Sequence, residues 1–158
     1  MKQKSVIACS KNWFIKYQKK NFKKNYIFIF KKKDLNLKKL KKIDPKRIFF
    51  PHWSYKVPNK IIKSFDCISF HLSPLPYGRG GSPIQNLIVR KIKNAPLCAL
   101  KMTKIIDGGA IYMKKKISLS GNLDQIFYRM SCVIKEFIYS IEKQNIKPKK
   151  QLGKIFKF

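Results

Sequence analysis

Acidic residues are scarce in this chain of 158 residues, which has seven aspartates and glutamates against 37 lysines and arginines and a formal net charge of +30. Arginine is scarce too: four of the 37 basic residues are arginine. Sites that grip phosphates or base edges usually favour the forked guanidinium group, so the charge is weak evidence for nucleic-acid binding. Because Ile, Asn and Phe are also abundant, we interpret the lysines mainly as the codon bias of an AT-rich genome, with polyanion binding as the alternative.

Cysteine is equally sparse. The four cysteines are scattered singly, without a Cys-x-x-Cys pair or a histidine at metal-ligand spacing, which excludes a recognisable zinc site or disulfide framework. We expect reduced, mostly buried thiols and no metal. No apolar run approaches the roughly 18 residues that a membrane span needs, and the run 6–9 is too short for the core of a signal peptide. The sequence therefore predicts a cytoplasmic protein without membrane insertion.

The remaining pattern is typical of one α/β domain, because apolar strand-like runs alternate with segments of helical spacing. Such alternation predicts a Rossmann-like, mainly parallel sheet with flanking helices, with ligands beyond the carboxyl ends of the strands. We expect the domain to span residues 1–146, followed by a loosely held basic tail at 147–158. The expected strands are 5–9, 26–30, 47–50, 66–70, 97–102 and 110–113, with 117–119 as a further candidate. The expected helices are 11–24, 34–43 (capped by Asp34), 58–63, 84–92 and 123–141 (capped by Asn122).

Candidates for proton transfer are few, because the chain has only two histidines and seven acidic residues. Two of these residues stand out. His71 follows the fourth expected strand and precedes a loop rich in Pro, Gly and Ser, where α/β proteins keep their sites. Asp107 precedes Gly108 and Gly109, which let the backbone turn sharply and pass close to a ligand. Taken alone, His71 is open to reading as a loop histidine and Asp107 as a plain turn aspartate.

The stretch from Ser69 to Gln85, SFHLSPLPYGRGGSPIQ, resembles the signature of the 10-formyltetrahydrofolate-dependent formyltransferases. That signature runs Asn-x-His-x-Ser-x-Leu-Pro, then a loop of tyrosine, arginine and glycine that ends in Pro-Ile. The family also has an Asp-x-Gly turn downstream, and Asp107 follows His71 by 36 positions, about the family separation. The similarity extends over residues 48–119. It implies the fold of the family's N-terminal domain and the transfer of a formyl group from 10-formyltetrahydrofolate to an amine.

The resemblance also implies roles for single residues. His71 would act as general acid and base and as oxyanion partner, and Asp107 would orient His71 and hold a shuttling water. The family asparagine two positions before the histidine is Ser69 here, so an oxyanion donor is shortened; Ser69 itself, His52 or Asn86 would have to supply it, with packing beside Trp53 as the other reading of His52. The expected folate-binding residues are Leu75, Pro76, Arg79, Gly80, Gly81, Gly108 and Gly109.

Two acceptors fit the resemblance. The tRNA enzymes of the family carry a further C-terminal domain that grips tRNA, whereas little of this sequence follows the last expected helix, so we expect the amine of a nucleotide-linked amino sugar. The high positive charge favours the alternative, methionyl-tRNA. A third hypothesis comes from another class: a catalytically weak or inactive lysine-rich binding protein, suggested by Ser69. The sequence does not indicate an oligomeric state.

Overall fold

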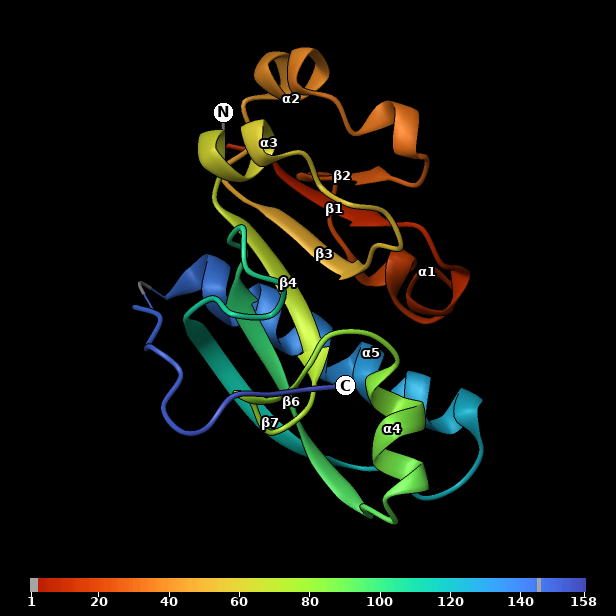
Figure 1. The fold of residues 1–158 in the computed structure, drawn as a ribbon. Coiled ribbons are helices and arrows are strands. Elements are labelled where there is room, and N and C mark those ends of the chain that lie inside the picture. Colours follow the sequence, from red (N-terminus) through yellow and green to blue (C-terminus); the bar gives the residue numbers. More distant parts are fainter. Residues whose placement is uncertain (1–2, 145) are drawn as a thin grey trace.

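The computed structural model describes residues 3–144 and 146–158. Met1 and Lys2, which precede the apolar run at the N-terminus, and residue 145, within the expected domain 1–146, lie outside the described residues. The centre of the fold is a six-stranded sheet with the order β2-β1-β3-β4-β6-β7 (Figure 1). Its strands are β1 (Ser5–Cys9), β2 (Tyr26–Ile29), β3 (Ile48–His52), β4 (Cys67–Leu72), β6 (Asn94–Lys101) and β7 (Ile111–Ser118).

The first four strands of the sheet pair in parallel, β1 with β2 and β3, and β3 with β4. β6 runs antiparallel to both β4 and β7. A mainly parallel sheet is therefore confirmed, with one reversed strand that brings the chain back beside β4. In this register His71 lies opposite Cys98.

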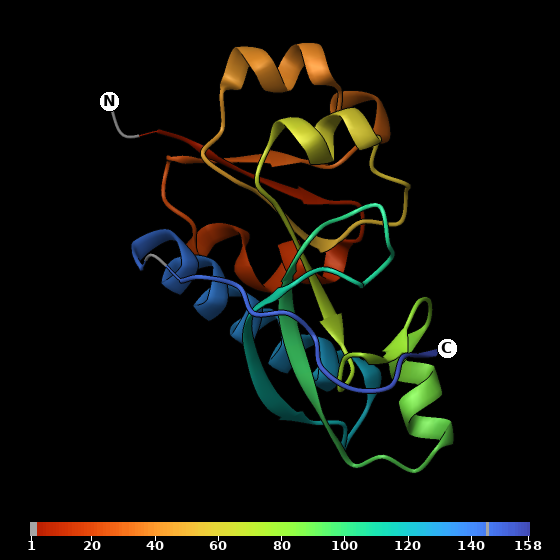
Figure 2. The same cartoon turned by 60° about the vertical axis from the view of Figure 1, so that its left-hand side comes forward.

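Helices cover both faces of the sheet (Figures 1 and 2). The face covered by α1 and α5 holds a core cluster that includes Phe14, Ile68 and Phe137, and the face covered by α2 and α3 holds a second cluster that includes Leu40 and Ile61. Successive side chains of a strand alternate between these two cores. The helices are α1 (Asn12–Gln18), α2 (Leu37–Ile43), α3 (Asn59–Ser64), α4 (Pro83–Val89) and α5 (Leu123–Lys143), with 3-10 turns at Lys19–Asn21 and Lys32–Asp34.

Local chemistry explains where the helices begin. The expected cap of α5 is confirmed: the Asn122 side chain accepts from the Gln125 backbone N–H and the Gln125 side chain accepts from the Asn122 N–H, a reciprocal capping box. The expected cap of α2 is wrong, because Asp34 ends a 3-10 turn and Asn36 caps the helix by accepting from the Lys39 N–H. The helix therefore begins at Leu37, two residues later than the expected cap would place it.

Three other expectations change. β4 extends to Leu72, so His71 lies inside the strand rather than after it. The separate strands expected at 110–113 and 117–119 are one strand, β7, because three consecutive exposed lysines at 114–116 interrupt the apolar pattern without interrupting the pairing with β6. The C-terminal segment is not loosely held: Phe156–Lys157 forms β8, which pairs in parallel with β5 (Tyr77–Arg79).

The expectation of mostly buried cysteines is confirmed, because Cys9, Cys67 and Cys98 are buried and Cys132 is half-buried. Within residues 3–144 and 146–158, no cluster of His, Cys, Asp and Glu could hold a metal ion. In the same part of the chain, no helix has the length and apolar content needed to cross a bilayer.

Candidate functional site

His71 is positioned by the alternation of β4. Its neighbour Leu72 and the preceding Ile68 enter the core under α5, so His71 and Ser69 face the opposite side of the sheet. The imidazole is 7% exposed and its Nε2 lies 2.7 Å from the carbonyl oxygen of Gly78. A carbonyl can only accept, so Nε2 carries a proton and donates it there. Nδ1 is therefore the basic nitrogen of the neutral ring.

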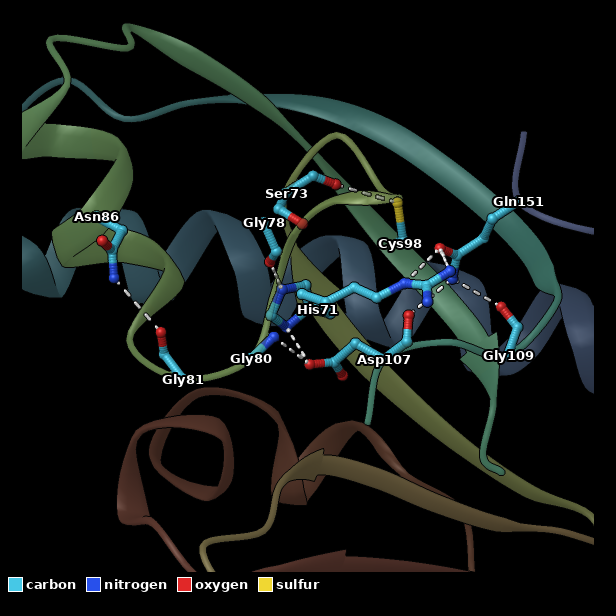
Figure 3. Close-up of polar contacts among 11 residues, drawn as sticks. His71, Ser73, Gly78, Gly80, Gly81, Asn86, Cys98, Asp107, Gly109 and Gln151 are labelled. Atoms are coloured by element: carbon cyan, nitrogen blue, oxygen red, sulfur yellow. Dashed lines mark hydrogen bonds and ion pairs between the residues drawn. The ribbon is translucent and has the colours of Figure 1, made fainter. Parts of the chain in front are cut away.

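Asp107 lies on the other side of His71 (Figure 3). Its Oδ2 is 3.5 Å from His71 Nδ1 and accepts a hydrogen bond of 3.0 Å from the Gly80 backbone N–H. The side chain is 16% exposed, so solvent screens this pair little. The expected proximity of His71 and Asp107 is confirmed. The distance exceeds that of an ordinary hydrogen bond between nitrogen and oxygen.

Close packing requires a glycine at position 109, two residues after the aspartate. A Cβ on Gly109 would lie 1.6 Å from the backbone oxygen of Lys101, and the Lys101 N–H donates to the Ala110 carbonyl at 2.9 Å. The turn is thus pressed against the end of β6, where only a hydrogen fits. Asp107 itself has φ +50°, a left-handed conformation that aspartate adopts more readily than most residues. These constraints aim the carboxylate at His71.

The expected folate-binding residues come together in two adjacent segments. One is the loop 75–82, which includes β5, and the other is the turn at Asp107; the Gly80 N–H joins them. Leu75 is half-buried, Pro76 and Gly109 are buried, Gly80 and Gly108 are half-buried, and Gly81 is exposed. The Arg79 guanidinium donates from Nε and Nη2 to the side-chain oxygen of Gln151. Two nitrogens of the Arg79 guanidinium therefore already have a partner within the protein. Contact of folate with any of the seven expected residues stays a prediction.

The candidate oxyanion donors differ in their freedom. Ser69 is half-buried on the same face of β4 as His71. His52 accepts a 2.9 Å hydrogen bond at Nδ1 from the indole of Trp13, and burial, with a smaller effect of Lys11, lowers its pKa. The His52 ring packs beside Trp13, whereas the alternative hypothesis for His52 placed it beside Trp53.

The side-chain amide of Asn86, the third candidate, already has hydrogen-bond partners. It donates to the Gly81 and Ser82 carbonyls and accepts from Arg90, and it points away from His71 in Figure 3. Asn86 and His52 are therefore engaged elsewhere, which leaves Ser69 as the candidate best placed beside His71.

Two residues beside the site, Gln151 and Phe158, were not predicted from the sequence. Gln151 donates from Nε2 to the carbonyl oxygens of Asp107, at 2.7 Å, and Gly109, at 2.8 Å. The Phe158 N–H donates to the Arg79 carbonyl. The Phe158 ring packs so closely on Gly78 that a Cβ there would lie 2.5 Å from the ring. The aromatic residues near the C-terminus were the available signal, but they do not indicate what the segment covers.

Comparison with known proteins gives a consistent result. A solved methionyl-tRNA formyltransferase from Clostridium thermocellum is 39% identical, with a TM-score of 0.92, over 99% of this chain and 71% of its own. The curated methionyl-tRNA formyltransferase of Campylobacter lari is 31% identical over 123 residues, 75% of this chain and 41% of its own. A sugar N-formyltransferase from Shewanella is 15% identical with a TM-score of 0.75, over 100% of this chain and 77% of its own; at that identity it shows the fold alone.

No protein-family model matches the chain. The chain spans about 40% of the length of the first curated relatives that it matches, among them the methionyl-tRNA formyltransferase of Campylobacter jejuni, which is 29% identical. What those whole proteins do therefore bears on this chain only as a proposal.

Proposed function

The chain belongs to the folate-dependent formyltransferase family, and we propose that it transfers a formyl group from 10-formyltetrahydrofolate to an amine. The observation that carries the proposal is the pair His71 and Asp107, held 3.5 Å apart with Nδ1 facing Oδ2. The pair sits where a parallel sheet collects its ligands, and its residues are those implied by the family resemblance.

The chemistry of the pair suits acyl transfer to nitrogen. The acceptor amine must lose a proton as its bond to the formyl carbon forms, and Nδ1 of His71 is the nitrogen free to receive that proton. The resulting imidazolium has Asp107 on one side and the Gly78 carbonyl on the other. The same proton then leaves with the folate nitrogen as the bond between that nitrogen and the formyl carbon breaks. Ser69 supports the reaction by donating its hydroxyl to the developing oxyanion.

The donor fits the two segments that flank the pair. 10-Formyltetrahydrofolate supplies an electrophilic formyl group on a leaving nitrogen. The loop 75–82 and the turn at Asp107 would hold it through backbone groups, because Gly80 and Gly109 leave little side-chain bulk. Ile105 and Ile106 beside the turn are 62% and 74% exposed, and such exposed apolar side chains suit a flat heterocycle.

The acceptor has two candidates. Methionyl-tRNA is supported by the 39% identical structure and by the curated relatives, and we propose it first. An aminated nucleotide sugar is supported by solved relatives such as the Shewanella enzyme. Both acceptors carry phosphates, and a hollow of about 320 Å³ lined by Lys11, Lys19 and Phe30 opens at the carboxyl end of β1. We propose that the anionic part of the acceptor lies there.

A formyl-transfer assay tests the proposal. The full chain is incubated with 10-formyltetrahydrofolate and, separately, methionyl-tRNA and a panel of aminated nucleotide sugars, and the release of tetrahydrofolate is followed. We expect turnover with one acceptor class, abolished in His71→Ala. Gln144→Met, at the exposed C-cap of α5, is a surface control and keeps the parent rate. Unchanged turnover in His71→Ala would remove the mechanism.

Turnover is read alongside folate binding. Folate should raise the melting temperature of the parent by linkage, and a parent that gains no stability at saturating folate and formylates no acceptor would favour a binding protein of another kind.

A further inference from the structure

The C-terminal segment and the candidate site meet at a single side chain. Gln151 lies outside every helix and strand, yet its amide reaches the Asp107 turn and the loop 75–82 at once (Figure 3). Its Nε2 donates to Asp107 and Gly109, and its Oε1 accepts two hydrogen bonds from the Arg79 guanidinium. Both hydrogens and both lone pairs of the amide are therefore used. Because all hydrogen bonds of this amide go to the two segments, Gln151 links the Asp107 turn to the loop 75–82.

We propose that Gln151 is a positioning residue that sets the distance between Asp107 and His71; this rests on the proposed function, since it concerns the same pair. Gln151 grips the backbone oxygen of Asp107 itself, and the carboxylate of that residue is 3.5 Å from His71. Besides Gln151, the turn is held by the Gly80 N–H, which donates to the Asp107 carboxylate, and by the Gly108 N–H, which donates to the Ile105 carbonyl. It contacts β6 through Gly109, while Ile105 and Ile106 next to it are exposed.

The remainder of the C-terminal segment places Gln151 correctly. β8 pairs with β5, the Phe156 ring stacks on Tyr77 at 4.7 Å, and the Lys149 N–H and carbonyl exchange hydrogen bonds with Ile111. These contacts lie on both sides of Gln151 in the sequence, so its backbone is fixed at two points. Phe158 also packs over Gly78, whose carbonyl selects the tautomer of His71. The segment thus acts on both members of the pair.

Two substitutions separate this role from simple packing. Gln151→Met keeps the length of the side chain and removes every hydrogen bond. Gln151→Glu keeps an acceptor for Arg79 but turns a carboxylate toward the carbonyls of Asp107 and Gly109, so it releases the turn alone. In both variants we expect kcat to fall by about tenfold or more, because misplacement of a reacting group by about 1 Å can cost on the order of 100-fold. The affinity for folate should change less than kcat.

A spectroscopic signal reads the position of Asp107 without any activity. The Gly80 N–H donates to the Asp107 carboxylate at 3.0 Å. A hydrogen bond to an ionised acceptor is stronger than one to a neutral acceptor, so the Gly80 amide proton resonance should lie downfield and exchange slowly. In Gln151→Met and Gln151→Glu we expect that resonance to move toward its position in Asp107→Ala and to exchange faster. Gln144→Met should match the parent in rate, melting temperature and Gly80 resonance.

The two proposals fail in different ways. A Gly80 resonance unchanged in both Gln151 variants would overturn the positioning role, even if their activity fell. A parent inactive with every acceptor would overturn the proposed function, and the Gly80 resonance would still decide whether Gln151 places Asp107. A fall in kcat together with the shift in the Gly80 resonance supports both.

Discussion

Replacing Gly109 by alanine should damage both stability and catalysis, because the new methyl group has no space. The Cβ would lie 1.6 Å from the Lys101 carbonyl oxygen and 2.8 Å from its carbon, both backbone atoms of β6. Contacts under 3.0 Å are essentially never seen for a Cβ, so the turn must retreat from β6 by about 1.4 Å, the difference between 3.0 and 1.6 Å. Asp107, two residues earlier, moves with it.

The expected cost is at the upper end for overpacking, about 3 kcal/mol of unfolding free energy, or roughly 6 to 12 °C in melting temperature for a chain of this size. Turnover should fall by about 100-fold, from the displacement of the carboxylate. Urea unfolding and the formyl-transfer assay measure the two effects. Gly81→Ala is the matched control for stability, because its Cβ meets nothing within 4 Å, and it should stay within about 0.5 kcal/mol of the parent. A Gly109→Ala protein as stable as Gly81→Ala would refute the packing argument.

Three other predictions follow from the same structure. Ser69→Asn should preserve turnover or raise it, by up to about 100-fold, because the longer amide restores a stronger oxyanion donor; a fall in kcat at unchanged folate affinity would show that Ser69 is not at that position. Gly78→Ala should destabilise the fold, because φ is +78° and the Cβ would lie 2.5 Å from the Phe158 ring; adding Phe158→Ala should recover the part due to the clash, which a double-mutant cycle in urea measures. Burial raises the pKa of the Cys98 thiol from 9.0 to about 11, so its stabilising contribution is complete below pH 9 and is lost as pH rises toward 11; unfolding free energies at pH 8 and pH 10.5 should show a smaller loss in Cys98→Ala than in the parent.

The sheet was predictable because its signals are local. Strands such as β1 and β3 are continuous apolar runs, and a run buried on both faces is typical of a parallel sheet. The predicted bounds of strands and helices failed where polar residues interrupt an apolar run or where two residues could cap the same helix. The lysines of β7 divided one strand into two, and Asp34 competed with Asn36 for the same capping role, which burial and spacing alone do not resolve.

The candidate pair, His71 and Asp107, was predictable for a different reason. His71 belongs to a motif that runs into a glycine-rich loop, Asp107 is followed directly by two glycines, and the fixed spacing between the two motifs carries their relation along the sequence. Their roles nevertheless remain predictions, because the distance between them is compatible with a weak enzyme as well as an efficient one. The departure at Ser69 is where those two cases separate.

Gln151 left no such trace, and the reason is physical. Its donors meet backbone carbonyls, which every residue possesses, and its acceptor meets Arg79, 72 positions away. A contact with backbone imposes no residue type on its partner, so no pattern of side chains reveals it. The same property makes Gln151 a sensitive probe. The acceptor is a backbone carbonyl, which a substitution cannot remove, so the hydrogen bond is tested by changing the donor Gln151. Such a change leaves the side chains of His71 and Asp107 chemically intact. Gln151→Met also frees Arg79, whereas Gln151→Glu keeps the acceptor for that guanidinium. A loss of kcat shared by the two variants must then come from where the pair is held rather than from what it is.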